Sequence, residues 1–182
     1  QKFFPLLEYL ELKSIVITDL DAVQLIKSKY RKCPTEDGER TSNSALKGWF
    51  RNPAISMAEL RAKTPADKTR DFYRIAYQIP EEGSNHCARS YEDAFILANL
   101  AKFNIANDSA AARNAWKKAA GFGKSTEAIH FALMPKNWNV PLYIREALVW
   151  LSEPPPAPAM QVPPPEIDPA LGEAAAQAEV VL

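Results

Sequence analysis

Residues Ser14-Ile15-Val16-Ile17-Thr18-Asp19-Leu20-Asp21 decide how the rest of this sequence is interpreted. A short run of mostly β-branched, apolar residues ends abruptly in two aspartates, Asp19 and Asp21. Such a run predicts a strand buried on both faces, as in a parallel sheet. In open α/β sheets, ligands bind beyond the carboxyl ends of the strands. The stretch therefore predicts an α/β fold with a candidate site at the end of an early strand.

The two aspartates predict a metal site. Residues two apart on an extended chain point the same way, so both carboxylates would face the same crevice. Carboxylates this close repel each other, and a bound divalent cation is the usual compensation. The alternative is a surface turn in which Asp19 and Asp21 cap the next helix.

Periodicity and helix-capping residues predict further elements on both sides of this stretch. A second strand is expected at 72–79, where aromatic and β-branched residues are stopped by Pro80. Helices are expected at 1–12, after Thr41-Ser42-Asn43, and within 56–63, 90–100, 110–120, 125–134 and 141–151. We predict an α/β domain over 1–100 with a mainly parallel sheet flanked by helices, a helical domain over 101–152, and a proline-rich arm over 153–182.

The charges are unevenly distributed along the chain. The 182 residues carry 22 Lys and Arg against 22 Asp and Glu, which argues against a strongly basic nucleic-acid binder. The arm at 153–182, however, holds five acids and neither Lys nor Arg, so residues 1–152 carry a net charge of +5. A mildly basic body with an acidic arm leaves a nucleic-acid partner open.

Composition also bears on the compartment. Cys33 and Cys87 are too few for a disulfide framework, so we expect free thiols in the cytoplasm. The sequence has no run of 18 apolar residues and no secretory signal, so no membrane is expected. The chain opens at Gln1 with an apolar stretch, and we interpret it as a fragment of a longer protein.

A second acidic cluster, Ser90-Tyr91-Glu92-Asp93, opens a predicted helix. Ser90 and Asp93 have the spacing of a capping box, which leaves Glu92 free to reach a metal. Arg89 beside them would contact a phosphate or be solvated. The ending Gly123-Lys124-Ser125 invites a phosphate-loop interpretation, but the upstream glycine and the preceding strand are missing. Lys124 is then a loop lysine that either contacts a ligand or is solvated.

Lys27, Lys29, Arg31 and Lys32 form a basic run after the aspartates. Such a run is typical of a solvated helix end. Beside a metal site it could also hold a nucleic-acid backbone.

Several stretches together resemble the C-terminal TOPRIM catalytic region of OLD-family (overcoming lysogenization defect) nucleases. The resemblance covers roughly residues 1–152 and depends on the order of its motifs. They are Ile15 to Val23, Thr41-Ser42-Asn43, Ala88 to Phe95, Lys124 with Ala128, Pro141 to Ile144, and Leu148, Trp150 and Leu151.

The resemblance implies a TOPRIM-type domain with an appended helical domain and DNA cleavage with two Mg²⁺ or Mn²⁺ ions. It implies that Asp19, Asp21 and Glu92 hold metal, with Asp93 as a further ligand, and that Lys124 contacts the scissile phosphate. It implies a bacterial or phage-type protein whose N-terminal ATPase, outside this sequence, would bind ATP and form a homodimer. TOPRIM domains also use a glutamate upstream of the aspartate pair, which we expect to lie before Gln1.

Two other function classes remain open. Asp19 to Val23 also fits the motif of haloacid-dehalogenase-like phosphatases, in which Asp19 would be the nucleophile and Asp21 the acid or base. The chain could instead be a non-catalytic regulatory or dimerisation module whose acids only cap helices.

Overall fold

The computed structural model describes residues 3–123 and 137–154, and it has a mixed α/β fold with two small sheets. This confirms the predicted fold class in its coarse form. The predicted helix at 125–134, Lys124, and the proline-rich arm from residue 155 onward lie outside the described residues.

The first sheet contains the strand that precedes Asp19. Its order is β1 (Ser14–Ile17), β6 (Tyr73–Ala76) and β5 (Thr69–Arg70). Strands β1 and β6 are parallel, with Ser14 opposite Tyr73, whereas β5 pairs with β6 in the antiparallel sense. The predicted parallel pairing is found in β1 and β6, but the sheet is mixed, because only residues 71 and 72 join β5 to β6 and so short a connection forces an antiparallel pair.

The second sheet is an antiparallel ribbon that follows the aspartates directly. Its order is β3 (Lys29–Lys32), β2 (Ala22–Ile26) and β4 (Arg40–Thr41). Lys27 and Ser28 form its two-residue turn with φ angles of 48° and 64°, the left-handed values that tight hairpin turns need. The interpretation of the basic run as a helix end is wrong, because it is the tip and second strand of a hairpin.

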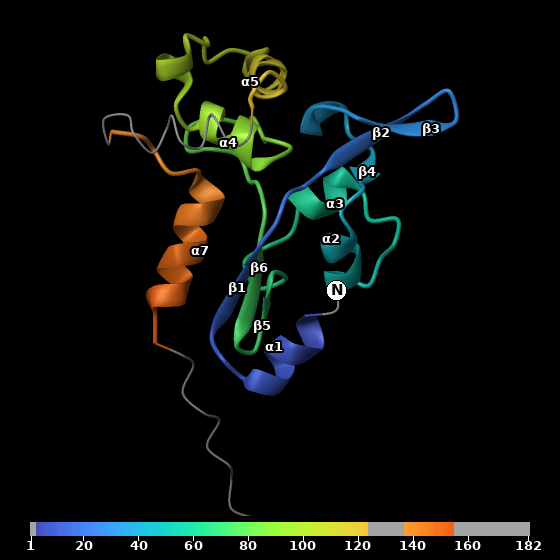
Figure 1. The fold of residues 1–182 in the computed structure, drawn as a ribbon, viewed down its shortest axis with the longest axis vertical. Coiled ribbons are helices and arrows are strands. Elements are labelled where there is room, and N and C mark those ends of the chain that lie inside the picture. Colours follow the sequence, from blue (N-terminus) through green and yellow to red (C-terminus); the bar gives the residue numbers. More distant parts are fainter. Residues whose placement is uncertain (1–2, 124–136, 155–182) are drawn as a thin grey trace, which may run out of the picture.

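Helices cover both faces of the first sheet. Tyr73 and Ile75 of β6 pack with helices α2 (Ser44–Trp49) and α3 (Met57–Arg61) in one apolar cluster. Ala76 packs on the other face, in a second cluster with α7 (Leu142–Ser152). In Figure 1, β1 and β6 accordingly lie between α7 and the pair α2 and α3. Helices therefore lie on both sides of the strand pair, but β1 itself is only half-buried and Ile17 is 47% exposed, so the prediction that this strand is buried on both faces is wrong.

The remaining helices pack beside these layers, at the two ends of the β1–β6 strand pair. Helix α1 (Phe4–Leu10) packs against α2 through Phe4. The short turn η1 (Thr35–Asp37) precedes β4. Helix α4 (Tyr91–Leu97), turn η2 (Leu100–Phe103) and helix α5 (Ala111–Ala119) join α7 in the second cluster. The cluster thus spans the boundary predicted at residue 100, and the domain division stays a prediction.

Across residues 3–123 and 137–154, every helix falls short of the length and apolar character that crossing a bilayer requires.

Candidate functional site

Residues Thr18 to Asp21, which we call the acid loop, continue β1 beyond its carboxyl end. The Thr18 amide still donates to the Ala76 carbonyl, 2.9 Å away, so the loop starts in register with β6. Leu20 is fully buried; its amide donates to Gln78 Oε1 at 2.7 Å, and its carbonyl accepts from Thr41 Oγ1 at 2.6 Å. The acid loop is therefore a fixed part of the core, and the next element is strand β2. The alternative that its aspartates cap a following helix is wrong.

Asn43 ties the acid loop to helix α2. As the N-cap of α2, it accepts from the Ala45 amide through Oδ1. Its Nδ2 donates to Thr18 Oγ1 at 2.7 Å and to the Asp19 carbonyl at 2.6 Å. The prediction of helix capping by residues 41–43 is confirmed, and the same side chain also holds the loop.

Asp19 is partly buried and is bound by Gln78. Its Oδ1 accepts a hydrogen bond from Gln78 Nε2 at 2.7 Å, which favours the charged form. Burial nevertheless raises the pKa of Asp19 above its ordinary value, and the charges of Asp21, Glu92 and Asp93 raise it further. The candidate acids are thus close enough to act on one another electrostatically.

Asp21 is held by a nearly buried arginine. Arg89 is 7% exposed; its Nη2 donates to Asp21 Oδ1 at 2.6 Å, and its Nε donates to the Ala22 carbonyl at 3.2 Å. Asp21 has a left-handed φ of 50°, and its amide donates to the Arg89 carbonyl. The expectation that Arg89 is solvated or contacts a phosphate differs from the structure, because Arg89 neutralises Asp21.

In the second acidic cluster, Asp93 caps helix α4 and Glu92 does not, as the capping-box spacing predicts. Asp93 is buried, and its carboxylate accepts from the backbone amides of Arg89 and Ser90, both at 2.7 Å. Ser90 and Asp93 thus form a capping box at the start of α4. Glu92 is partly exposed and accepts from Ser90 Oγ at 2.8 Å. Asp93 is therefore fully engaged in holding the helix end, which argues against its predicted role as a metal ligand.

A cavity of about 390 Å³ opens beside the acid loop. Its lining comes from the end of β1, the acid loop, and the starts of α2, α4 and α7: Ile17, Thr18, Asp19, Asp21, Asn43, Tyr91, Tyr143 and Ile144. Asp19 and Asp21 therefore share one solvent-accessible space, as the sequence predicts. Within the described part of the chain, His, Cys, Asp and Glu form no group of three or more that could hold a metal ion.

Sequence reasoning missed Gln78 and Tyr143. Gln78 is 1% exposed and follows β6 as the acid loop follows β1, and its Nε2 also lies 3.3 Å from the Tyr143 hydroxyl. Burial and the charge of Asp19 raise the pKa of Tyr143. The available signal was the place of Gln78, a polar residue near the end of the strand predicted at 72–79 and just before Pro80.

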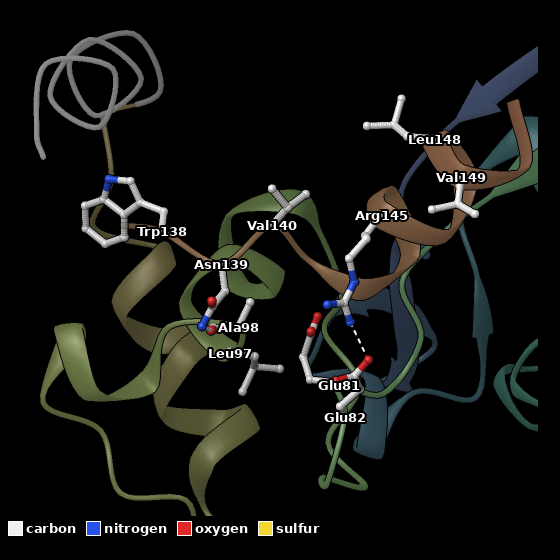
Figure 2. A pocket seen from close by; sticks show the side chains of 10 residues that line it. All are labelled: Glu81, Glu82, Leu97, Ala98, Trp138, Asn139, Val140, Arg145, Leu148 and Val149. Carbon is white, nitrogen blue, oxygen red and sulfur yellow. Dashed lines mark hydrogen bonds and ion pairs between the residues drawn. The ribbon is translucent and has the colours of Figure 1, made fainter. Parts of the chain in front are cut away.

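A separate cavity of about 540 Å³ lies between the end of α4 and helix α7 (Figure 2). Its charged and amide side chains already have partners in the chain. Figure 2 shows Arg145 bound to Glu82. Glu81 accepts from the Leu142 amide, and Asn139 donates to the Ala98 carbonyl. These groups join α7 to the rest of the fold, and the cavity carries no further functional assignment.

No protein-family model, no curated protein and no solved structure matches this chain. The resemblance to OLD-family nucleases therefore stays a prediction that depends on the ordered motifs alone.

Proposed function

We propose that the acid loop binds a divalent cation and that the protein is a metal-dependent DNA endonuclease. The observation that carries the proposal is the placement of Asp19 and Asp21 in one cavity, at the carboxyl end of a strand in a parallel pair. This is the position at which α/β proteins bind their ligands.

The donor set in this cavity fits Mg²⁺ or Mn²⁺. The residues that line the cavity include Asp19, Asp21, Thr18 and Asn43, whose side chains carry oxygen atoms, and none of the lining residues carries sulfur or imidazole. Hard cations prefer such oxygens, and Mg²⁺ is commonly held by one or two carboxylates while it keeps several waters. Asp19 and Asp21 would hold the ion; Glu92 is close enough to raise the pKa of Asp19 but does not line the cavity. The second ion implied by the resemblance stays a prediction.

Several residues of the chain would position the ligands of the ion. When bound, the cation would supply Lewis-acid activation and neutralise charge on the phosphate. Gln78 and Asn43 orient Asp19 and the loop backbone, and Arg89 fixes Asp21. Lys124, outside the described residues, keeps its predicted contact with the scissile phosphate.

We extend the proposal to the arrangement that the resemblance implies. A parallel strand pair covered by helices on both faces supports a TOPRIM-type domain, with α5 and α7 as parts of the appended helical domain. Two buried, free thiols, Cys33 and Cys87, support a cytoplasmic location. Assembly as a homodimer through an N-terminal ATPase belongs to the same proposal.

The first test measures metal binding and does not depend on the predicted upstream glutamate. Mg²⁺ at about 100 times its dissociation constant should stabilise the protein by about 2.7 kcal/mol. For a chain of this size that raises the Tm by roughly 5–11 °C. Asp19→Asn should lose this increase. Asp108→Asn, the same change at an exposed residue that caps the Ala110 amide, should keep it.

The second test measures DNA cleavage. Supercoiled plasmid should be nicked or linearised with Mg²⁺ or Mn²⁺ but not with EDTA, and Asp19→Asn should slow cleavage by at least about 100-fold. If the wild type lacks activity, a longer version that restores the upstream glutamate is assayed, and no cleavage by that version would exclude a nuclease.

Hydrolysis of small phosphate monoesters through a phosphorylated Asp19 would support the phosphatase class instead. Mg²⁺ binding equal in wild type and Asp19→Asn would contradict the metal site.

A further inference from the structure

We infer that the β2–β3 hairpin binds the phosphate backbone of duplex DNA on one side of the acid loop. The inference rests on the proposed nuclease function and adds to it a specific substrate-binding surface.

The hairpin carries a dense positive charge. Lys27, Lys29, Arg31 and Lys32 lie within six residues, and the sequence has no Asp or Glu from 22 to 35. All four cations are exposed. Among the residues that the structure describes, none of the four forms an ion pair with a carboxylate. Exposed cations without internal partners are free to replace the counterions of a nucleic acid.

The strand geometry spaces these charges regularly. Lys29 and Arg31 are two residues apart on β3, so their side chains leave the same face about 6.7 Å from each other. One strand of a duplex carries a phosphate about every 3.4 Å along the helix axis. The strand also winds around that axis, so neighbouring phosphates lie farther apart than this rise, and two cations about 6.7 Å apart on one face suit neighbouring phosphates.

The opposite face is stiffened by an aromatic contact. Tyr30 lies on that face, and the Arg40 guanidinium of the neighbouring strand β4 sits 3.6 Å from the centre of its ring. This cation–π contact ties the hairpin to the rest of its sheet. A ribbon held in this way presents Lys29 and Arg31 with little loss of conformational freedom on binding.

The hairpin is also correctly placed for the substrate of the acid loop. Strand β2 begins at Ala22, directly after Asp21, and in Figure 1 the hairpin extends away from the body of the protein. Its five residues span about 17 Å, which equals about five base steps of a duplex. A duplex cut at the acid loop would therefore meet the hairpin tip about five base pairs from the scissile phosphate.

The experiment measures how salt weakens binding of the full chain to a labelled duplex, with Ca²⁺ replacing Mg²⁺ to suppress cleavage. Lys29→Gln/Arg31→Gln should reduce the slope of log affinity against log salt concentration by about 2, because each lost phosphate contact removes about 0.9. Arg51→Gln/Arg61→Gln removes the same charge from exposed positions on another surface, and should leave the slope unchanged. An unchanged slope in the hairpin variant, or an equal change in both variants, would overturn the inference.

A second measurement separates this inference from the nuclease proposal. The hairpin variant should keep the Mg²⁺-dependent rise in Tm and should hydrolyse a small phosphodiester at the wild-type rate. A wild type that binds duplex through the hairpin but neither binds Mg²⁺ nor cleaves would refute the nuclease alone. A wild type that binds polyglutamate but no duplex would refute the hairpin inference in favour of an acidic protein partner.

Discussion

At the scale of single residues, Gln78 is the side chain on which the acid loop depends. It accepts from the Leu20 amide and donates to Asp19, and both partners lie in a segment 58 residues or more away. The side chain is 1% exposed, so its hydrogen bonds are made in a region from which water is excluded. Buried polar groups that lose their partners carry a full desolvation penalty.

We therefore expect Gln78→Leu to lower the free energy of unfolding by about 1–3 kcal/mol, because the buried Leu20 amide would lose its acceptor. The pKa of Asp19 would also rise further without the hydrogen bond that lowers it. Chemical denaturation measures the first effect. Gln24→Leu, the same change at a partly exposed position of β2, should stay within about 0.5 kcal/mol. Equal losses in the two variants would contradict this role.

At the scale of elements, helix α7 begins on a carboxylate from another part of the chain. Both oxygens of Glu81 lie 3.2 Å from the Leu142 amide, one of the donors that a helix start leaves without an internal partner. Burial raises the pKa of Glu81 above its ordinary value of 4.5, although this hydrogen bond and Arg145 oppose the rise. Ionised Glu81 therefore stabilises the start of α7 by a hydrogen bond but pays a desolvation penalty for its buried charge.

The sign of the pH effect follows from that raised pKa. The folded state binds the Glu81 proton more tightly than the unfolded state, so this contribution to stability is full below about pH 4.5 and is lost as the pH rises through the folded pKa. Glu81→Gln keeps an acceptor for Leu142 without the charge. Its stability relative to wild type should therefore improve from about pH 4 to about pH 7.

Glu81→Ala separates the hydrogen bond from the charge. It removes the acceptor altogether and should cost about 1 kcal/mol near neutral pH, as the loss of a helix cap does. Urea denaturation across the pH range measures both variants. A Gln variant that loses stability relative to wild type as the pH rises would show that the charge, and not only the acceptor, stabilises α7.

At the scale of the whole molecule, the packing of helices on both faces of the β1–β6 pair holds the residues of the site close to one another. Trp49 is 1% exposed in the cluster on one face, with its ring centre 5.5 Å from that of Phe4 and 5.2 Å from that of Tyr73. It therefore joins α1, α2 and β6. The opposite face is closed by Tyr143 and Ala147 of α7.

Trp49→Ala should lower the free energy of unfolding by about 3–5 kcal/mol, since it removes a large buried ring that three elements share. Trp150→Ala is the matched variant, because Trp150 is partly exposed and its ring is contacted by the Lys13 ammonium. Thermal unfolding followed by circular dichroism should show a clearly smaller loss there. Similar losses for both would mean that this cluster is not the main core.

Local patterns predicted local features well. The strand before Asp19, the N-cap at Asn43 and the capping box of Ser90 and Asp93 are all found. Each depends on residues close in sequence. The hairpin at residues 22–32 was missed, because its four neighbouring basic residues obscure the alternation that marks a strand.

The sequence by itself determined the mixed α/β fold and a strand that ends in two aspartates. Only the tertiary structure decided what surrounds those aspartates. Gln78, Arg89 and Tyr143 reach the acid loop from segments 58 to 124 residues away, and no periodicity links residues so far apart. The pairing of β1 with β6 and the packing of α7 on that pair bring them there. The physical reason is that periodicity and capping act within a few turns of chain, whereas burial, ion pairing and shifted pKa values depend on which distant segments come together.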